Sequence, residues 1–207
     1  MPSRFLLSIA ITSLCSLMLC ACGNITESSS PAGGVYQRQS NLPQERVSLT
    51  SIDGDWKSSC VADLATRMNY TVELSFQDNL LLSRTVNFAD ENCTVSTTEE
   101  ERVSKITLDL SDDSHATLNE SFLTLKYRPT SNQATAQLNS DSFCGYQKWD
   151  LNQFRVFTDA TTCNLNASDL YQIELYGDRE LHLMTCKSAD TSDCQTLKLQ
   201  KSTENTD

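Results

Sequence analysis

The stretch MNYTVELSFQDNLLLSRTVNF, residues 68–88, decides the fold of this chain. In its first half every second residue is apolar, at Met68, Tyr70, Val72, Leu74 and Phe76. Alternation with a period of two is typical of a β-strand with one buried face. After a polar break at 77–79, apolar residues resume at Leu80, Leu82, Val86 and Phe88, with Arg84 as the exception. The two runs predict a β-hairpin.

The same alternation continues along the chain. It recurs at 106–110, 123–127, 171–175, 181–183 and 197–199. About nine to eleven strands emerge, while helical periodicity is confined to short runs at 60–67 and 132–138. Closely spaced strands joined by polar turns predict an all-β fold, an antiparallel barrel with a β-sandwich as the alternative.

Composition excludes several classes of protein. The chain has 207 residues, with 27 acidic against 16 basic residues and a formal net charge of −11. Such a balance would repel a phosphate backbone, so we expect no nucleic-acid partner. Only the N-terminus approaches the length of a membrane-spanning apolar run, which excludes a polytopic membrane protein.

The N-terminus has the features of a secretion signal. Arg4 precedes the apolar run Phe5–Leu19, and small residues follow. The sequence Leu19-Cys20-Ala21-Cys22 resembles the lipobox of bacterial lipoproteins, which implies that Cys22 is acylated and becomes the first residue of the mature chain. The alternatives are an ordinary secretory signal and an uncleaved anchor helix.

The lipoprotein resemblance also implies a location. Gly23 follows Cys22, whereas in that family an Asp at this position resembles a retention signal for the inner membrane. We therefore expect a lipid-anchored protein of the bacterial outer membrane, on its periplasmic or its surface face. The several acyl chains typical of the family, palmitate among them, would make this membrane anchor firm.

Four segments follow from these features. Residues 1–21 form the predicted signal peptide, and 22–50, rich in Gly, Pro and Ser, form a lipidated flexible tether. The β-barrel domain is predicted over 51–200. A polar tail occupies 201–207.

The cysteines predict a disulfide framework. Of nine, Cys15 and Cys20 leave with the signal and Cys22 carries lipid. The remaining six are Cys60, Cys93, Cys144, Cys163, Cys186 and Cys194. In an oxidising envelope we expect three disulfides among them.

Spacing favours one set of pairs among the roughly 15 that six cysteines allow. The short polar segment between Cys186 and Cys194 is typical of a hairpin turn, which favours their pairing. Cys60–Cys93 and Cys144–Cys163 are then the simplest completion. A zinc site is disfavoured because no two cysteines have the spacing of a zinc knuckle.

Gly54-Asp55-Trp56, followed by strands in chain order, resembles the Gly-x-Trp signature of lipocalins and other calycins. In that family the tryptophan lies on the first strand and closes one end of the barrel, and a small apolar ligand enters the other end. The resemblance implies a barrel-closing role for Trp56. The alternative is a core residue packed beside Cys60.

A wider resemblance rests on 54–60, 92–93, 144–149 and 171–181. These segments are similar to a group of uncharacterised bacterial envelope lipoproteins with a lipocalin-like domain. The likeness implies a fold and a location, and it assigns no activity.

Catalytic motifs are missing from the sequence. Of the two histidines, His115 follows the acidic turn 112–114, and His182 lies between Leu181 and Leu183 as a strand-surface residue. Neither belongs to a Gly-x-Ser-x-Gly elbow or a His-Glu-x-x-His helix. We therefore expect no catalytic residue and no enzyme, and we rank an enzymatic function last.

The acidic residues have a structural explanation. We interpret Glu99–Glu101 and Asp112–Asp113 as solvated charge that protects strand edges. Adjacent acids on a strand point to opposite faces, so they rarely share a proton. Calcium binding at Asp53, Asp55 or Asp112–Asp113 is an alternative, which the missing ligand spacing of an EF-hand disfavours. We expect no metal and no cofactor.

Two functions compete. The first is a non-catalytic lipoprotein whose barrel binds an apolar small molecule or lipid. The alternative is a protein-interaction lipoprotein, either a hydrolase inhibitor or an envelope structural partner. The acidic chain would steer such a protein towards basic partners such as lysozymes.

Overall fold

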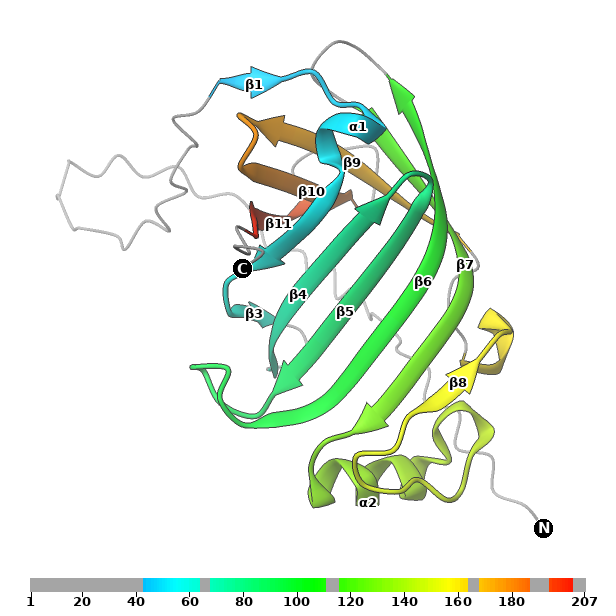
Figure 1. The fold of residues 1–207 in the computed structure, drawn as a ribbon. Helices are drawn as coiled ribbons and strands as arrows, with labels where there is room; N and C mark the ends of the chain where they lie inside the picture. The colour runs from blue at the N-terminus through cyan, green and yellow to red at the C-terminus, as the bar shows by residue number, and fades with distance from the viewer. Residues whose placement is uncertain (1–42, 64–67, 111–115, 164–167, 187–193, 203–207) are drawn as a thin grey trace, which may run out of the picture. The chain divides into compact units, whose positions relative to one another are not determined.

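The computed structural model describes residues 43–63, 68–110, 116–163, 168–186 and 194–202. Eight strands follow one another around a closed antiparallel barrel in chain order (Figure 1). They are β2 Gly54–Ser58, β4 Met68–Gln77, β5 Leu80–Phe88, β6 Ser96–Leu110, β7 Ala116–Pro129, β9 Ser168–Tyr176, β10 Glu180–Cys186 and β11 Cys194–Lys201. The barrel closes where Leu199 of β11 lies opposite Ser58 of β2. The predicted all-β barrel is confirmed, and its up-and-down order is that of lipocalin-like barrels.

Three short strands belong to the same sheet and flank the barrel strands. They are β1 Gln44–Glu45 beside β9, β3 Val61–Asp63 beside β4, and β8 Arg155–Phe157 beside β7. Val47, between β1 and the next element, is buried in the core. The packed domain therefore includes residues that precede position 51.

The predicted hairpin is confirmed as β4 and β5, joined at Asp78, whose φ of 54° is left-handed. The predicted inner face of β5 is wrong. Leu80 and Leu82 are exposed on the outer wall, whereas Leu81 is buried opposite Phe76. Paired residues share a face, so the apolar face of β4 places Leu81 inside. Arg84 is therefore an ordinary outer residue and no exception.

One end of the barrel is filled by apolar side chains. The most deeply buried are Ile52, Trp56, Phe76, Ile106, Leu118, Ile173, Leu175, Leu181 and Leu199. Burial of each such side chain contributes about 1.5–3 kcal/mol. The short helix α1, Leu49–Ile52, lies at this end, and Ser48 and Ser51 cap it reciprocally. The Trp56 indole N–H donates to the Ile52 carbonyl at 2.7 Å and ties strand to helix.

A second apolar cluster packs on the far half of β7. Ala116–Ser121 pairs with β9, but Leu125–Tyr127 pairs with β8 instead. Helix α2, Asn132–Asp141, contacts β6 and β7 near their ends (Figure 1). The cluster contains Leu125, Tyr127, Leu138, Phe143, Trp149 and Phe157. Two 3₁₀ turns, Phe143–Gly145 and Ala160–Cys163, complete this region.

The two helix predictions have different outcomes. The helix predicted at 132–138 is confirmed as α2. The helix predicted at 60–67 is wrong over Val61–Asp63, which form β3, and 64–67 lie outside the described residues. The apolar groups of β3 sit beside β4, and pairing with that strand overrides the local helical pattern. Within the described ranges, no helix has the length and apolar character needed to cross a bilayer.

Two predicted disulfides are confirmed. Cys60–Cys93 ties the chain between β2 and β3 to the loop after β5, and Cys144–Cys163 joins the two 3₁₀ turns. Cys186 and Cys194 lie opposite each other in the β10–β11 register, but their side chains lie outside the described part. Cys22 lies outside it as well.

Candidate functional site

A pocket of about 470 Å³ opens at the barrel end opposite α1, between β3 and β11. Tyr70, Tyr171, Leu183 and Leu197 line it from the inner faces of four strands. Three of these side chains pack against the apolar core, and Leu183 belongs to that core. The pocket floor is therefore the open end of the core itself.

The opening follows from a local change of register. Lys57 of β2 lies opposite Glu73 of β4, and Val61 of β3 lies opposite Tyr70 of β4. The chain from β2 to β3 therefore advances four residues while β4 advances three. This is a β-bulge, which bends the strand. The Ser58 hydroxyl accepts the Val72 backbone N–H at 2.8 Å where the regular pairing is interrupted.

As a result β3 and β11 separate. β11 pairs with β2 through Leu199, Gln200 and Lys201, while β3 pairs with β4. Among the described residues no pairing joins β3 to β11, and the pocket occupies the space between them. The barrel wall is thus open to the side at this end.

The described lining of the pocket includes one charged side chain. Asp63 is the one charged residue among the described residues that line it, and Thr185 and Gln195 add polar atoms. Burial, and then the charge of Asp63, raise the pKa of the Tyr70 phenol. Tyr70 therefore stays neutral at ordinary pH, as a hydrogen-bond donor and acceptor beside an apolar floor.

A polar layer crosses the barrel interior between the two apolar clusters. The Ser104 hydroxyl donates to Glu120 Oε1 at 2.5 Å, and Arg102 Nε lies 3.1 Å from the same oxygen. Arg102 also lies over the Phe122 ring, 5.5 Å from its centroid. Burial raises the pKa of Glu100, which shares this inner face with Arg102.

The prediction that Glu99–Glu101 are solvated edge charges is wrong, because β6 is an internal strand paired on both sides. Glu99 is buried on the outer wall, and Glu100 faces the interior. The polar layer has a signal in the sequence that was missed. Glu100, Arg102 and Ser104 follow the same period of two as the buried Ile106.

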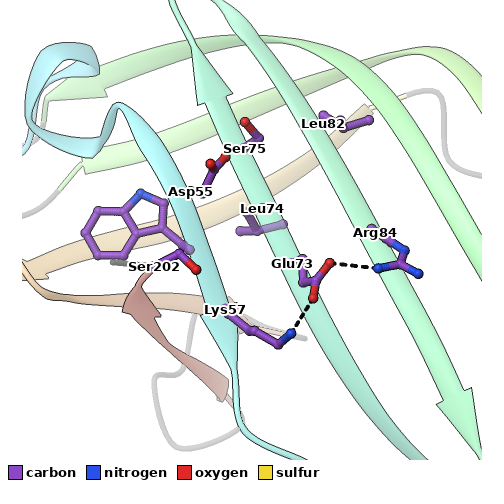
Figure 2. Close-up of a pocket in the computed structure, with 9 residues that line it drawn as sticks. Asp55, Lys57, Glu73, Leu74, Ser75, Leu82, Arg84 and Ser202 are labelled. Atoms are coloured by element: carbon purple, nitrogen blue, oxygen red, sulfur yellow. Dashed lines mark hydrogen bonds and ion pairs between the residues drawn. The ribbon is translucent and has the colours of Figure 1, made fainter. Parts of the chain in front are cut away.

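The outer wall carries a shallow groove of about 320 Å³ over β2, β4 and β5. Figure 2 shows Lys57 and Arg84 converging on Glu73, at 2.5 Å and 3.0 Å. Hydrogen bonding from Lys57, the largest effect, together with Arg84 lowers the pKa of Glu73 despite its partial burial. Both cations in the groove thus form ion pairs with the same carboxylate.

The ion-pair network continues onto β6 and β7. Arg84 Nε lies 2.6 Å from Glu99 Oε1, and Arg128 pairs with the other carboxylate oxygen. Burial alone would raise the pKa of Glu99, but the two arginines outweigh burial and hold its pKa below the ordinary value. Lys126 and Glu101 form a further pair at 3.0 Å.

The structure separates the residues singled out by sequence. Trp56 lies at the α1 end, away from the pocket between β3 and β11. His182, predicted to be a strand-surface residue, is buried. Its Nε2 is 2.6 Å from Glu180 Oε1, and its ring lies against Tyr176 at a tilt of 46°. His115 lies outside the described residues.

The close neighbours of the His182 ring are not nucleophiles. Its Nε2 is 2.6 Å from Glu180 Oε1 and the ring lies against Tyr176, and neither of these residues is a serine or a cysteine. Among the residues that the structure describes, no three His, Cys, Asp or Glu side chains gather as metal ligands. Asp53 and Asp55, the calcium candidates of the sequence, border different surface hollows, and Asp112–Asp113 lie outside the described residues.

No protein-family model matches this chain, and no curated protein matches it either.

Proposed function

We propose that this chain is a non-catalytic binding protein whose barrel takes a small, largely apolar molecule or lipid into the pocket between β3 and β11. The observation that carries this proposal is the lateral opening onto the apolar floor of Leu183 and Leu197. Its volume, about 470 Å³, lies in the range of ligand pockets, roughly 300–1,000 Å³. A few polar groups at the rim would orient the ligand.

The rest of the interior supports this placement. The α1 end is filled by Trp56, Phe76 and Ile173, so a ligand would bind at the open end. The inner face of β7 becomes polar next to the pocket. Leu118 of β7 lies opposite Tyr171, and the next inward-facing residue of β7 is the buried Glu120. Burying an apolar chain against that carboxylate would be unfavourable. The pocket therefore suits a compact ligand.

Probe binding tests the site. Thr185 lines the pocket and is exposed, so Thr185→Trp would fill the mouth without disturbing the core. Thr107 on β6 is also an exposed strand threonine, and Thr107→Trp serves as the matched control. We expect the neutral probe N-phenyl-1-naphthylamine to bind the wild type and T107W, with at least tenfold weaker binding to T185W. Equal binding to all three proteins would refute this site. Native mass spectrometry of protein from its own host would then identify the bound mass.

We further propose that the protein is anchored in the outer membrane through lipid on Cys22. The lipobox-like sequence 19–22 and the polar segment after it support this part of the proposal. Intact-mass analysis of the membrane fraction should find the acylated chain beginning at Cys22. A Cys22→Ser variant that stayed in the membrane fraction would contradict the anchor.

A second candidate is a protein-interaction role on the outer wall. Leu80, Leu82 and Leu123 expose 42%, 44% and 43% of their surfaces there, and Leu82 borders the groove of Figure 2. An acidic chain would favour a basic partner. Crosslinking in cells, and inhibition assays with basic hydrolases at low ionic strength, should then depend on Leu82. If both the crosslinking and the inhibition persist in Leu82→Glu, this role is contradicted.

A further inference from the structure

We infer that the outer wall of β5, β6 and β7 docks on the surface of a lipid bilayer that carries anionic headgroups. This inference goes beyond ligand binding, and it rests on the proposed anchor at Cys22 only for bringing the wall to the bilayer. The juxtaposition that carries it is a strip of apolar side chains bordered by exposed cations.

The strip runs across three neighbouring strands. Leu82 of β5 lies opposite Val103 of β6, which lies opposite Thr124 of β7. The register of β6 and β7 shifts at this point, so that Leu123 is an extra residue beside Thr124, as in a β-bulge. We call Leu80, Leu82, Val103 and Leu123 the leucine strip, and its three leucines are exposed.

Cations border the leucine strip on all three strands. Arg84 follows Leu82 by two residues on β5, and Figure 2 shows both side chains. Lys105 of β6 is exposed opposite Leu80, and Lys126 is exposed on β7. Neighbouring strands are only about 5 Å apart, so a surface that meets the strip also meets these cations.

The cations of the outer-wall ion pairs stand further out than their carboxylates. Lys126 exposes 46% of its side chain and Glu101 26%, while Arg84 exposes 42% and Glu99 5%. The other ion pairs of this wall follow the same order. A partner that approaches the wall therefore meets positive charge first.

The acidity of the rest of the chain does not cancel this local charge. The formal net charge is −11, and Asp55 on β2 and Asp109 near the end of β6 are exposed at the margins of the wall. Salt screens charges beyond about 8 Å at physiological ionic strength, so the groups at the contact dominate. Exposed leucines among lysines and arginines suit the interface of an anionic bilayer. Apolar side chains that protrude from a convex wall can enter this fluid interface, whereas a protein partner would need a matching hollow.

The proposed anchor makes a weak contact sufficient. Residues 23–42 separate Cys22 from Pro43, where the described residues begin. A chain of that length spans at most about 70 Å, so the domain stays within reach of the bilayer. Tethering makes docking an intramolecular step with a high effective concentration.

Docking through the leucine strip also determines where the pocket faces. In the barrel order, β6 and β7 lie across from the junction of β11 with β2. The pocket between β3 and β11 would therefore open towards the aqueous phase, away from the bilayer.

Lysine footprinting on vesicles tests the inference. The mature lipidated protein is reconstituted into vesicles of phosphatidylcholine alone, or of equal parts of phosphatidylcholine and phosphatidylglycerol, and is acetylated briefly with acetic anhydride. We expect Lys105 and Lys126 to react about three- to fivefold more slowly on the anionic vesicles, and this protection to disappear in about 1 M salt. Lys148 is exposed in the segment before β8, outside the wall, and its rate should be unchanged.

Matched variants separate docking from the charge of the vesicle. Leu82→Ser combined with Leu123→Ser removes the leucines on either side of Val103 and should reduce the protection of Lys105 to less than about 1.5-fold. Leu151→Ser changes a similarly exposed leucine in the turn before β8 and should leave the protection unchanged. Circular dichroism checks that each variant keeps the fold.

The outcomes separate this inference from the proposed anchor. If the protein floats with both kinds of vesicle but Lys105 and Lys126 react equally on them, the anchor stands and docking is refuted. Docking is also refuted if the double serine variant keeps the protection, or if Lys148 is protected equally. If the protein does not float with phosphatidylcholine vesicles, the anchor fails, and flotation with the anionic vesicles still tests docking. Protection in intact cells but on neither kind of vesicle would identify an acidic protein as the partner and overturn the bilayer.

Discussion

Two neighbouring glutamates on β6 should have opposite effects on stability. Glu99 points outward and is held between Arg84 and Arg128, whereas Glu100 points inward, where burial raises its pKa. We predict that Glu99→Gln destabilises the fold at pH 7 and that Glu100→Gln stabilises it. The substitutions keep the size of the side chain, remove its charge and replace one acceptor oxygen by an NH2 donor.

The magnitudes follow from burial. Removing one partner of a buried ion pair costs about 3–5 kcal/mol. Glu99 has a side chain only 5% exposed, but Arg84 and Arg128 are 42% and 29% exposed and remain partly hydrated. We therefore expect E99Q to lower the free energy of unfolding by about 1.5–3 kcal/mol. E100Q leaves Arg102 paired with Glu120, and we expect a gain of roughly 0.5–1 kcal/mol.

Stability depends on pH with opposite signs at the two glutamates. The pKa of Glu99 is lowered in the folded protein, so its stabilisation is present above the ordinary glutamate pKa and is lost as pH falls through the folded value. The pKa of Glu100 is raised, so its penalty is present above the folded value and disappears as pH falls to the ordinary pKa. Both variants should therefore converge on the wild type in acid.

Urea unfolding followed by circular dichroism, at pH 7 and in steps to about pH 3, below the ordinary glutamate pKa, measures all three proteins. Opposite shifts of the midpoint at pH 7, both shrinking in acid, are the expected result. Shifts of the same sign at pH 7 would show that the two carboxylates do not occupy opposite faces with different environments, and the reasoning would be wrong.

Three further predictions concern local contacts. Trp56→Phe should lower the melting temperature more than Trp149→Phe, because Trp56 donates a hydrogen bond while the indole N–H of Trp149 has no partner in the described structure. Replacing both cysteines of Cys60–Cys93 by serine should cost about 3.7 kcal/mol in urea unfolding, from the entropy of a 33-residue loop. Ser142→Gly should stabilise the fold by about 0.5–1 kcal/mol and so raise the urea midpoint, because Ser142 ends α2 with a left-handed φ of 50°, which glycine adopts without steric cost.

The sequence predicted those elements in which one face is uniformly apolar. β4 was predicted correctly because Val72, Leu74 and Phe76 all enter the core. β5 was assigned the wrong face because, from Ser83 onward, its inner residues are polar and the larger apolar residues lie outside. A period of two identifies the strand, but it cannot say which face is inside when the interior itself contains charge.

The pocket could not be predicted because it depends on a register shift. In the sequence, the polar interruption is Ser58-Ser59-Cys60. The opening arises because β11 pairs with β2 whereas β3 pairs with β4, and this difference is not visible in the local sequence. The disulfide Cys60–Cys93 holds the same interruption from outside the barrel strands. Pairing between distant strands, rather than local pattern, therefore determines where the wall opens.

The polar layer explains how one barrel contains both a solid core and an open end. The inner face of β6 changes from Ile106 to Ser104, Arg102 and Glu100, and the second apolar cluster follows beyond it. Glu120 on β7 forms an ion pair with Arg102 and accepts a hydrogen bond from Ser104, both on β6. These polar contacts hold the two strands together where apolar side chains do not fill the interior. The apolar filling can then end at Leu183, where β3 departs from β11. A core that stops short beside a polar layer leaves an apolar floor facing solvent, which is the condition a binding pocket requires.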